Sequence, residues 1–407
     1  MRRVVITGGS IVSALGSEWA DIFAKLKEKK NLVRRMNEWD RYTRMNTRLA
    51  VPVDFTMPDY PRKKTRGLGR VAQLALVSAD KALAHAGLNA DDPELKNGRC
   101  GVAYGSSMGS VDSLMDFYSM LVLDDLTNMS ATTYIKAMPQ TCAANIGVFF
   151  GLTGRIITTN TACTSSSQAI GFAYETIKQG IQDIMLAGGA EELSPANAAV
   201  FDTLFAASSK NDSPQKTPAA YDKNRDGLVI GEGAGTLILE EYEHAVKRGA
   251  KIIAEIVGFG TNTDGTHITQ PNRETMGIAM KLALENAGLD PASIAYVNTH
   301  GTATDTGDVA ESWATADIFK RPVPASTLKS YIGHTLGACG VIEAWIAINM
   351  MREKWFCPNL NLEELDSRCG PLDYITGDGR KIDGEYIMSN NFAFGGVNTS
   401  LIFRNLP

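Results

Sequence analysis

The sequence is poor in the features that mark membrane-spanning, secreted and nucleic-acid-binding proteins. No apolar run reaches the roughly 18 residues that a membrane-spanning helix needs. The N-terminal segment RRVVITGGSIVSALG has the charge of a signal peptide, but Gly8, Gly9 and Ser10 break its apolar run, so a buried strand followed by a glycine turn is predicted. The 40 basic and 45 acidic residues argue against a general nucleic-acid binder.

Cysteine is scarce and follows no metal or redox spacing. The six cysteines form no CxxC pair and stand at positions 100, 142, 163, 339, 357 and 369. In a chain of 407 residues without a clear secretion signal, they are expected to be reduced thiols in the cytoplasm. The P-loop, HExxH and GxGxxG motifs do not occur in their required context. The many glycines are therefore expected in tight turns and at close packing contacts.

One segment has the partial pattern of a calcium loop. Asp222, Asn224 and Asp226 occupy the first, third and fifth positions of such a loop. The twelfth position, which needs a bidentate glutamate, is Gly233, and the preceding segment contains two prolines where an EF-hand needs a helix. Calcium binding here is disfavoured.

Hydrophobic periodicity alternates between strand and helix patterns along the chain. Apolar residues at helical spacing predict helices over 18–29 and 68–86, the second closed by Gly87, and further helices from Cys163 to about residue 179 and around 242–248. Short apolar runs predict strands over 3–7, 101–107, 155–163 and 183–192, and a strand pair with a glycine-rich bend over 228–243. This alternation is typical of an α/β protein.

The pattern restarts near Lys251, which predicts an internal duplication. Three segments recur in the same order: RRVVITGG as AKIIAEIVGFG (250–260), LAHAGL (83–88) as LENAGL (284–289), and EGAGTLIL (232–239) as GGVNTSLI (395–402). We therefore expect two similar α/β halves, residues 1–250 and 251–407.

Cys163 is the cysteine whose context suits catalysis. It follows an apolar strand and stands at the first turn of an expected helix, among small neighbours that leave room for a substrate carbonyl. Free N–H groups and the positive end of the helix dipole favour a thiolate and can hold an oxyanion. A buried structural cysteine is the equally weighted alternative.

Two of the five histidines also stand where α/β proteins place ligands. His300 ends an apolar strand, and His334 lies between an expected strand and helix. Together with Cys163 they suggest thiolate chemistry on an acyl group. Zinc ligation by the same three residues is the alternative, but no short ligand spacing supports it.

The chain resembles the elongating β-ketoacyl-acyl-carrier-protein synthases of the thiolase superfamily. The resemblance spans nearly the whole chain and rests on separated motifs in order, among them TAC at 161–163, NTHGTATDTGD, LKSYIGHTLGACG and NNFAFGGVNTSLIF. It implies a thiolase-like α/β fold with two duplicated halves in α-β-α-β-α layers. It also implies decarboxylative condensation of an acyl thioester with malonyl-acyl-carrier protein, as a step of fatty-acid synthesis. This reaction requires no metal and no redox cofactor.

The resemblance also implies roles for individual residues. Cys163 carries the acyl chain, and His300 and His334 assist decarboxylation. Lys329 and Glu343 form a supporting charged pair, and the backbone N–H groups of Cys163 and Phe394 form the oxyanion hole. The side chain of Phe394 gates the acyl pocket, Met108 limits that pocket, and Thr302 and Thr304 bind the pantetheine arm.

Partners follow from the same resemblance. Lys63 and Arg66, in the basic run 62–70 of an acidic chain, match residues that contact the acidic acyl-carrier protein. A homodimer is expected, and a heterodimer with a related subunit stays open. Two alternatives remain: a synthase of a polyketide or aryl-polyene pathway, and a non-catalytic chain-length-factor-like partner, which retention of Cys163, His300 and His334 disfavours.

The chain departs from the family pattern at four positions near these motifs. Ala393 replaces a usual glycine in the gating loop, Thr164 follows the nucleophile, Cys339 replaces a usual alanine and Asp305 a frequent proline. None removes a catalytic group. Together they leave room for a specialised acyl substrate.

Overall fold

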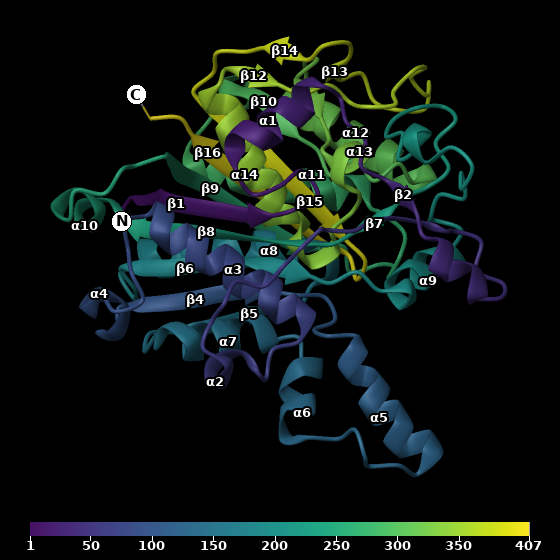
Figure 1. Cartoon of the computed structure of the whole chain (residues 1–407). Coiled ribbons are helices and arrows are strands. Elements are labelled where there is room, and N and C mark those ends of the chain that lie inside the picture. The colour runs from purple at the N-terminus through teal and green to yellow at the C-terminus, as the bar shows by residue number, and fades with distance from the viewer. Residues whose placement is uncertain (407) are drawn as a thin grey trace.

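A single 11-stranded mixed sheet runs through the molecule (Figure 1). The structure is a computed structural model that describes residues 1–406. The strands of one half are β1 (Val4–Val12), β8 (Gly233–Glu241), β6 (Ile184–Glu191), β4 (Cys100–Gly105) and β5 (Ile156–Thr159). The strands of the other are β9 (Ala254–Thr263), β16 (Val397–Arg404), β15 (Tyr386–Ala393), β10 (Ile294–Asn298), β11 (Pro324–Ser326) and β13 (Asp373–Tyr374).

The two halves repeat one pairing pattern, which confirms the predicted duplication. From β1 outward, two antiparallel pairings with β8 and β6 are followed by two parallel ones with β4 and β5. From β9 outward, β16 and β15 pair antiparallel, and β10 and β11 follow in parallel. The halves meet where Val4–Ile6 of β1 pair with Ala254–Ile256 of β9. The division at residue 250 stays a prediction.

Helices form the layers around these strands, in the predicted α-β-α-β-α order. Helix α3 (Arg70–His85) packs on β1 and β8, and α7 (Thr141–Phe150) on β4, on one outer side. Helix α11 (Arg273–Ala287) packs on β9 and β16 on the other, with α12 (Asp305–Phe319) beside it. Helices α8 (Ser165–Lys178) and α14 (Cys339–Arg352) contact strands of both halves, and α14 is buried from Cys339 to Met351. These two inner helices start at the candidate site.

The predicted glycine turn after residue 7 is wrong, because β1 continues through Gly8 and Gly9 to Val12. A Cβ at Gly8 would lie 2.5 Å from the Ala82 carbonyl oxygen of α3, and a Cβ at Gly9 2.6 Å from the Trp345 ring of α14. These glycines let a helix approach each face of the strand. Strand β6 likewise continues through its two glycines, where a turn was expected.

The predicted strand pair over 228–243 is also wrong. Strand β7 (Ile230–Gly231) pairs with β3 (Leu49–Val51) in a three-stranded sheet that includes β2 (Arg34–Arg35), whereas β8 belongs to the large sheet. Between them, the buried Glu232 carboxylate accepts hydrogen bonds from Arg70 at 2.7 Å and from the Val53 backbone at 2.8 Å. These bonds redirect the chain from one sheet to the other.

The remaining elements lie at the periphery. The predicted helices near 18–29 and 242–248 are confirmed as α1 (Trp19–Lys27) and α10 (Tyr242–Lys247). Helices α5 (Asp112–Leu123) and α6 (Ala131–Ala137) form an arm that projects from the body (Figure 1). The shorter elements are α2 (Arg62–Thr65), α4 (Pro93–Lys96), α9 (Pro195–Thr203), α13 (Lys329–Ile332), β12 (Trp355–Phe356) and β14 (Arg380–Lys381). Over residues 1–406, every helix is too short or too polar to cross a membrane.

Candidate active site

Cys163 lies at the predicted place, in a 3-10 turn (Ala162–Thr164) between β5 and α8. The side chain of Ser165 shapes this turn, because its hydroxyl accepts the Thr161 backbone N–H at 3.0 Å and donates to the Ala162 carbonyl at 2.7 Å. Ala162 adopts a φ of +48°, a left-handed conformation that costs a non-glycine residue free energy. The tight turn presents the sulfur at the start of the helix.

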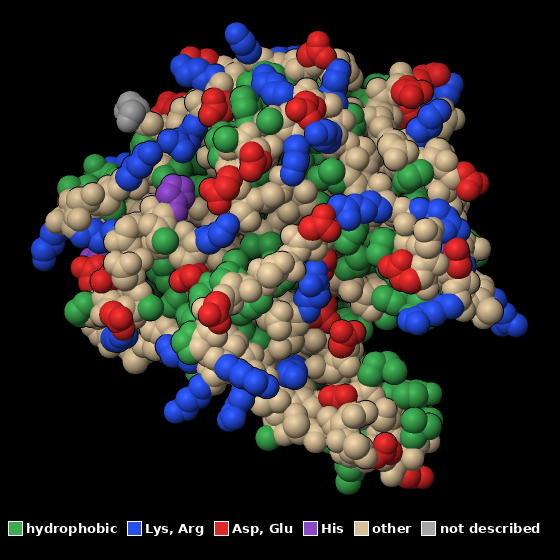
Figure 2. Space-filling view, in the orientation of Figure 1, with side chains coloured by type: hydrophobic (Ala, Val, Ile, Leu, Met, Phe, Trp, Pro, Cys, Tyr) green, Lys and Arg blue, Asp and Glu red, His purple; other side chains and the backbone are tan. Residues whose placement is uncertain are grey.

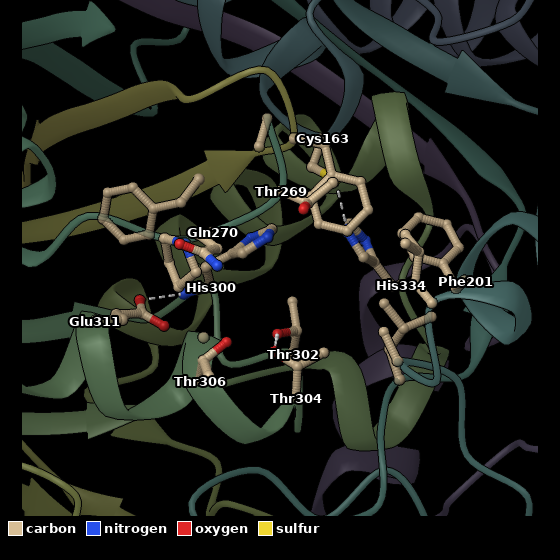
Figure 3. A pocket seen from close by; sticks show the side chains of 18 of the residues that line it. Cys163, Phe201, Thr269, Gln270, His300, Thr302, Thr304, Thr306, Glu311 and His334 are labelled. Atoms are coloured by element: carbon tan, nitrogen blue, oxygen red, sulfur yellow. Dashed lines mark hydrogen bonds between the residues drawn. The ribbon is translucent and has the colours of Figure 1, made fainter. Parts of the chain in front are cut away.

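The sulfur faces a cavity of about 220 Å³ between the two halves (Figure 3). Both candidate histidines, Thr302 and Thr304 line this cavity, together with Phe394. The two threonine hydroxyls are 2.9 Å apart and hydrogen-bonded to each other. The structure thus brings together the residues predicted to carry the acyl chain, assist decarboxylation and bind the pantetheine arm.

His334 is held against Cys163. Its Nε2 lies 3.0 Å from the Cys163 sulfur, and its backbone N–H donates to the Val229 carbonyl at 2.7 Å. The Leu336 backbone N–H donates to Nδ1 at 3.2 Å, so Nδ1 is an acceptor and a neutral ring carries its proton on Nε2. Burial lowers the pKa of His334 well below its ordinary value, and the Lys329 ammonium lowers it further. At neutral pH, His334 therefore donates a hydrogen bond to the sulfur.

His300 approaches from the end of β10, and its ring lies 5.1 Å from that of His334 at an angle of 86°. The buried Glu311 of α12 fixes its backbone, because the N–H groups of His300 and Gly301 donate to the two carboxylate oxygens at 2.6 and 2.7 Å. Burial, Lys329 and His334 lower the pKa of His300 well below its ordinary value. Both imidazoles are therefore neutral at neutral pH.

The expectation of a thiolate at Cys163 is wrong for the free site. Burial raises the pKa of the thiol to about 12. The Lys329 ammonium and the backbone N–H groups of Cys163 and Phe394 oppose this rise without reversing it. The oxyanion hole formed by these two N–H groups stays a prediction. The resting site thus holds a thiol beside a neutral imidazole.

Lys329 and Glu343 form the predicted charged pair, 2.5 Å apart and fully buried. Burial alone would lower the pKa of Lys329, but the Glu343 carboxylate raises it, so the side chain stays an ammonium. Its positive charge reaches both histidines and the cysteine, as their pKa shifts show. The pair therefore acts on the site through charge rather than through contact with the cavity.

The zinc alternative does not fit this geometry. Ligand atoms of Cys163, His300 and His334 lie within 4.8 Å of one another. However, a sulfur and a nitrogen on one tetrahedral zinc are about 3.5 Å apart, given Zn–S and Zn–N lengths of about 2.3 and 2.0 Å. The observed 3.0 Å from Cys163 to His334 is a hydrogen-bond distance to sulfur. The three residues are arranged for hydrogen bonding rather than for ligation.

The calcium-loop acids are used within the protein. Asp222 accepts the backbone N–H groups of Asn224, Glu363 and Glu364, and Asp226 accepts the Ser208 hydroxyl. Within residues 1–406, the clusters of His, Cys, Asp and Glu side chains that could hold a metal ion contain no residue of this segment. The segment orders loops.

Besides Lys329 and Glu343, three predicted residues lie outside the cavity lining. Met108 instead lines a second cavity of about 1110 Å³ between α5, α9 and residues 36–45. Lys63 and Arg66 are exposed at α2, where Figure 2 shows Lys and Arg side chains gathered on the surface. Their roles stay predictions.

Sequence reasoning missed Asn391, Glu311 and Glu191, although the first two lie in or near quoted motifs and Glu191 lies in the strand predicted over 183–192. Asn391, in β15, donates to Glu343 at 2.8 Å, and its Nδ2 lies 3.4 Å from Nδ1 of His300. Glu191, at the end of β6, accepts the backbone N–H groups of Ser107 and Gly337 at 2.8 and 3.0 Å. Polar residues inside apolar strands and helices were the available signal, because a buried polar group needs partners.

Comparisons with known proteins agree with the site. Residues 1–245 match the family described as "Beta-ketoacyl synthase, N-terminal domain", and residues 253–363 match "Beta-ketoacyl synthase, C-terminal domain". The 3-oxoacyl-[acyl-carrier-protein] synthase 2 of Vibrio harveyi is 37% identical, covering 100% of this chain and 99% of the relative.

Two solved structures extend the comparison. A β-ketoacyl synthase from Burkholderia phymatum is 58% identical with a TM-score of 0.99, over the full length of both chains. A ketosynthase from Xenorhabdus doucetiae, solved in complex with its chain length factor, is 26% identical with a TM-score of 0.84, covering 100% of this chain and 98% of that one.

Proposed function

The chain belongs to the β-ketoacyl synthase family, and we propose that it extends acyl chains by decarboxylative condensation with malonyl-acyl-carrier protein at Cys163. The product is a 3-oxoacyl thioester longer by two carbons, as in fatty-acid synthesis. The observation that carries the proposal is the geometry at one sulfur. The Nε2 of His334 lies 3.0 Å from the Cys163 sulfur, and His300 lines the same cavity between the two halves.

The first step transfers the acyl group. The Cys163 sulfur attacks the thioester carbonyl of acyl-carrier protein, a new C–S bond forms, and the pantetheine sulfur leaves with the proton that Cys163 loses. The backbone N–H groups of Cys163 and Phe394 would stabilise the oxyanion, because fixed donors contribute most where negative charge develops. The thiol's raised pKa makes this proton transfer part of the step.

The second step forms the carbon–carbon bond. Malonyl thioester loses carbon dioxide, and the electron pair that remains is delocalised onto the thioester oxygen as an enolate. His300 and His334 stabilise that oxygen as hydrogen-bond donors, because both rings are neutral and line the cavity. The enolate carbon then attacks the Cys163 thioester and expels the sulfur as a thiolate, which takes up one proton from solvent to restore the resting thiol. The reaction balances without a metal or a redox cofactor.

The cavity wall suits the substrate arm. The hydroxyls of Thr302 and Thr304 offer hydrogen bonds to the amide groups of phosphopantetheine. The Phe394 ring packs 5.4 Å from Phe201 at the acyl side and is half-buried, which suits a gate. Ala393 needs no left-handed conformation, whereas Gly395 and Gly396 have φ of +88° and +71°, so any hinge lies after the ring rather than before it.

We place carrier-protein contact at α2 and self-association at the β5 side. Lys63 and Arg66 are exposed and complement an acidic partner. Strand β5 ends the large sheet, and the neighbouring arm exposes 72% of Leu121 and 64% of Leu123. Figure 2 shows hydrophobic side chains gathered on this arm. An open strand edge and an apolar surface favour association with a second chain.

The cytoplasm remains the predicted location.

A specialised pathway is the second candidate, with the same chemistry on another acyl chain. The full-length similarity to the Xenorhabdus doucetiae ketosynthase, which pairs with a chain length factor, favours it. Measured molar mass in solution, alone and with a related subunit, separates a homodimer from a heterodimer.

The deciding experiment is a condensation assay. Purified protein receives malonyl-acyl-carrier protein and a panel of acyl-carrier proteins with saturated, unsaturated and aromatic acyl groups, and products are identified by mass spectrometry. We expect 3-oxoacyl products, with none from Cys163→Ala. Condensation by Cys163→Ala, or none by the native protein with any acyl group, would overturn the proposal. The preferred acyl group distinguishes the two pathways.

A further inference from the structure

Asn391 connects the charged pair to a catalytic histidine. It is buried near the end of β15, three residues before Phe394. Its Nδ2 lies 2.8 Å from Glu343, 3.4 Å from Nδ1 of His300 and 3.5 Å from the sulfur of Cys339. Its Oδ1 accepts the Ser167 hydroxyl at 2.7 Å. Ser167, Cys339 and Glu343 are buried outside the cavity lining, whereas His300 is part of it.

The orientation of this amide follows from its neighbours. A carboxylate only accepts hydrogen bonds, so the Asn391 atom that faces Glu343 must be the NH₂ group. The opposite atom, Oδ1, then accepts from Ser167, whose hydroxyl can donate. Both ends of the amide are satisfied in this orientation, and the flipped one would set two oxygens against each other.

The second hydrogen of the NH₂ group meets His300. One hydrogen is used by Glu343, and the other points at Nδ1 of His300 and the adjacent Cys339 sulfur. A nitrogen that receives a donor must present its lone pair. We propose that Asn391 is a positioning residue that holds the ring proton of His300 on Nε2, leaving that nitrogen as a hydrogen-bond donor in the cavity.

Cys339 supports the same arrangement without bonding to the His300 ring. Its thiol donates to the Cys163 backbone carbonyl at 3.1 Å, so its sulfur is free to accept from Asn391. His334 receives its own donor from the Leu336 backbone. Both catalytic rings thereby present an Nε2–H, one fixed by the backbone and the other by a side chain.

The role of the His300 donor rests on the proposed function, since an enolate oxygen is what it would meet. The tautomer itself does not depend on activity. It can be read from the ¹⁵N shifts of the ring nitrogens in protein labelled at histidine, with the His300 signals assigned by their loss in His300→Ala.

We expect the native protein to show an unprotonated Nδ1 and a protonated Nε2 at His300. Asn391→Asp replaces the donor by an acceptor of nearly the same shape and should move the proton to Nδ1. Cys339→Ala is the matched control, because it removes the neighbouring contact of the same amide and should leave the tautomer unchanged. Asn391→Ala, should Asn391→Asp not fold, should still shift the Nδ1 signal through loss of its hydrogen bond.

Activity provides a second readout. Acylation of Cys163 uses backbone donors and should be retained in Asn391→Asp, whereas decarboxylation of malonyl-acyl-carrier protein should fall about 100-fold, as for other lost oxyanion donors. A native proton on Nδ1, an unchanged tautomer in Asn391→Asp, an unshifted Nδ1 signal in Asn391→Ala, or equal shifts in Cys339→Ala would overturn the inference. A native protein with the expected tautomer but no condensation would instead overturn only the proposed function.

Discussion

Replacing Lys329 by methionine should destabilise the protein in a way that depends on pH. Lys329 and Glu343 are 2.5 Å apart and buried, so the substitution leaves a buried carboxylate without its cation. Removing one partner of a buried pair typically costs about 3–5 kcal/mol. With an unfolding entropy of about 2.1 cal/mol/K per residue over this length, that loss lowers Tm by about 4–6 °C.

The pH dependence follows from two sets of groups. Burial raises the pKa of Glu343, and without Lys329 the carboxyl takes up a proton more readily, so the deficit shrinks as pH falls. Burial and Lys329 both depress the pKa values of His300 and His334, so the native protein loses stability as pH falls below about 6.5. The Lys329→Met variant lacks this positive charge, so it loses less stability than the native protein over the same fall in pH. Both effects make the deficit largest at alkaline pH.

The assay is Tm at pH 6, 7 and 8 for Lys329→Met, Glu343→Gln and the double variant. The double variant should lose less than the sum of the single losses, because no charge stays buried alone. Additive losses, or a Lys329→Met deficit that grows as pH falls, would refute this view of the pair.

Three further predictions concern other parts of the molecule. Burial raises the pKa of Glu191 to about 7, so the stability that this carboxyl contributes is present below pH 4.5 and is lost as pH rises through about 7. Glu191→Gln should therefore flatten the curve of Tm against pH over that window, and an unaltered curve would contradict this. Gly340→Ala would place a Cβ 2.2 Å from the Ser167 hydroxyl, so denaturant titration should show a loss of about 1–3 kcal/mol; a loss near zero would mean that α8 and α14 can separate freely. The double variant Lys63→Glu, Arg66→Glu should lower kcat/KM for acyl-carrier protein at low salt with kcat kept, and a defect that persists at high salt would speak against a charge-steered encounter.

The layered fold and the Cys-His-His set could be predicted from sequence because both leave local marks. Segments similar to RRVVITGG, LAHAGL and EGAGTLIL recur in the same order in the second half, and this order indicates the duplication. The position of Cys163 at a strand-to-helix turn indicates the nucleophile. The pairing of Lys329 with Glu343 was predicted only from the family resemblance, because their spacing in the sequence does not indicate a contact. The structure brings these groups together from segments up to 180 residues apart, such as Cys163 and His334 at 171.

The features that could not be predicted from the sequence depend on burial and on contacts with distant segments of the chain. Gly8 and Gly9 look like a turn until Ala82 and Trp345 are seen against the strand. The helix dipole favours a thiolate at Cys163, yet the sulfur's burial outweighs it. Asn391 is one polar residue among several in its motif, and only the contacts with Glu343 and His300 single it out.

The central claim is that Cys163 carries the growing chain as a thioester. Incubation with acyl-carrier protein in the absence of malonyl donor should trap it, and intact-protein and peptide mass spectrometry should find one acyl group per chain, on the peptide that contains Cys163. Cys163→Ala should stay unmodified, and adding malonyl-acyl-carrier protein should discharge the native adduct as a 3-oxoacyl product. An acyl group on any other cysteine, or an adduct that malonyl-acyl-carrier protein does not discharge, would contradict the claim.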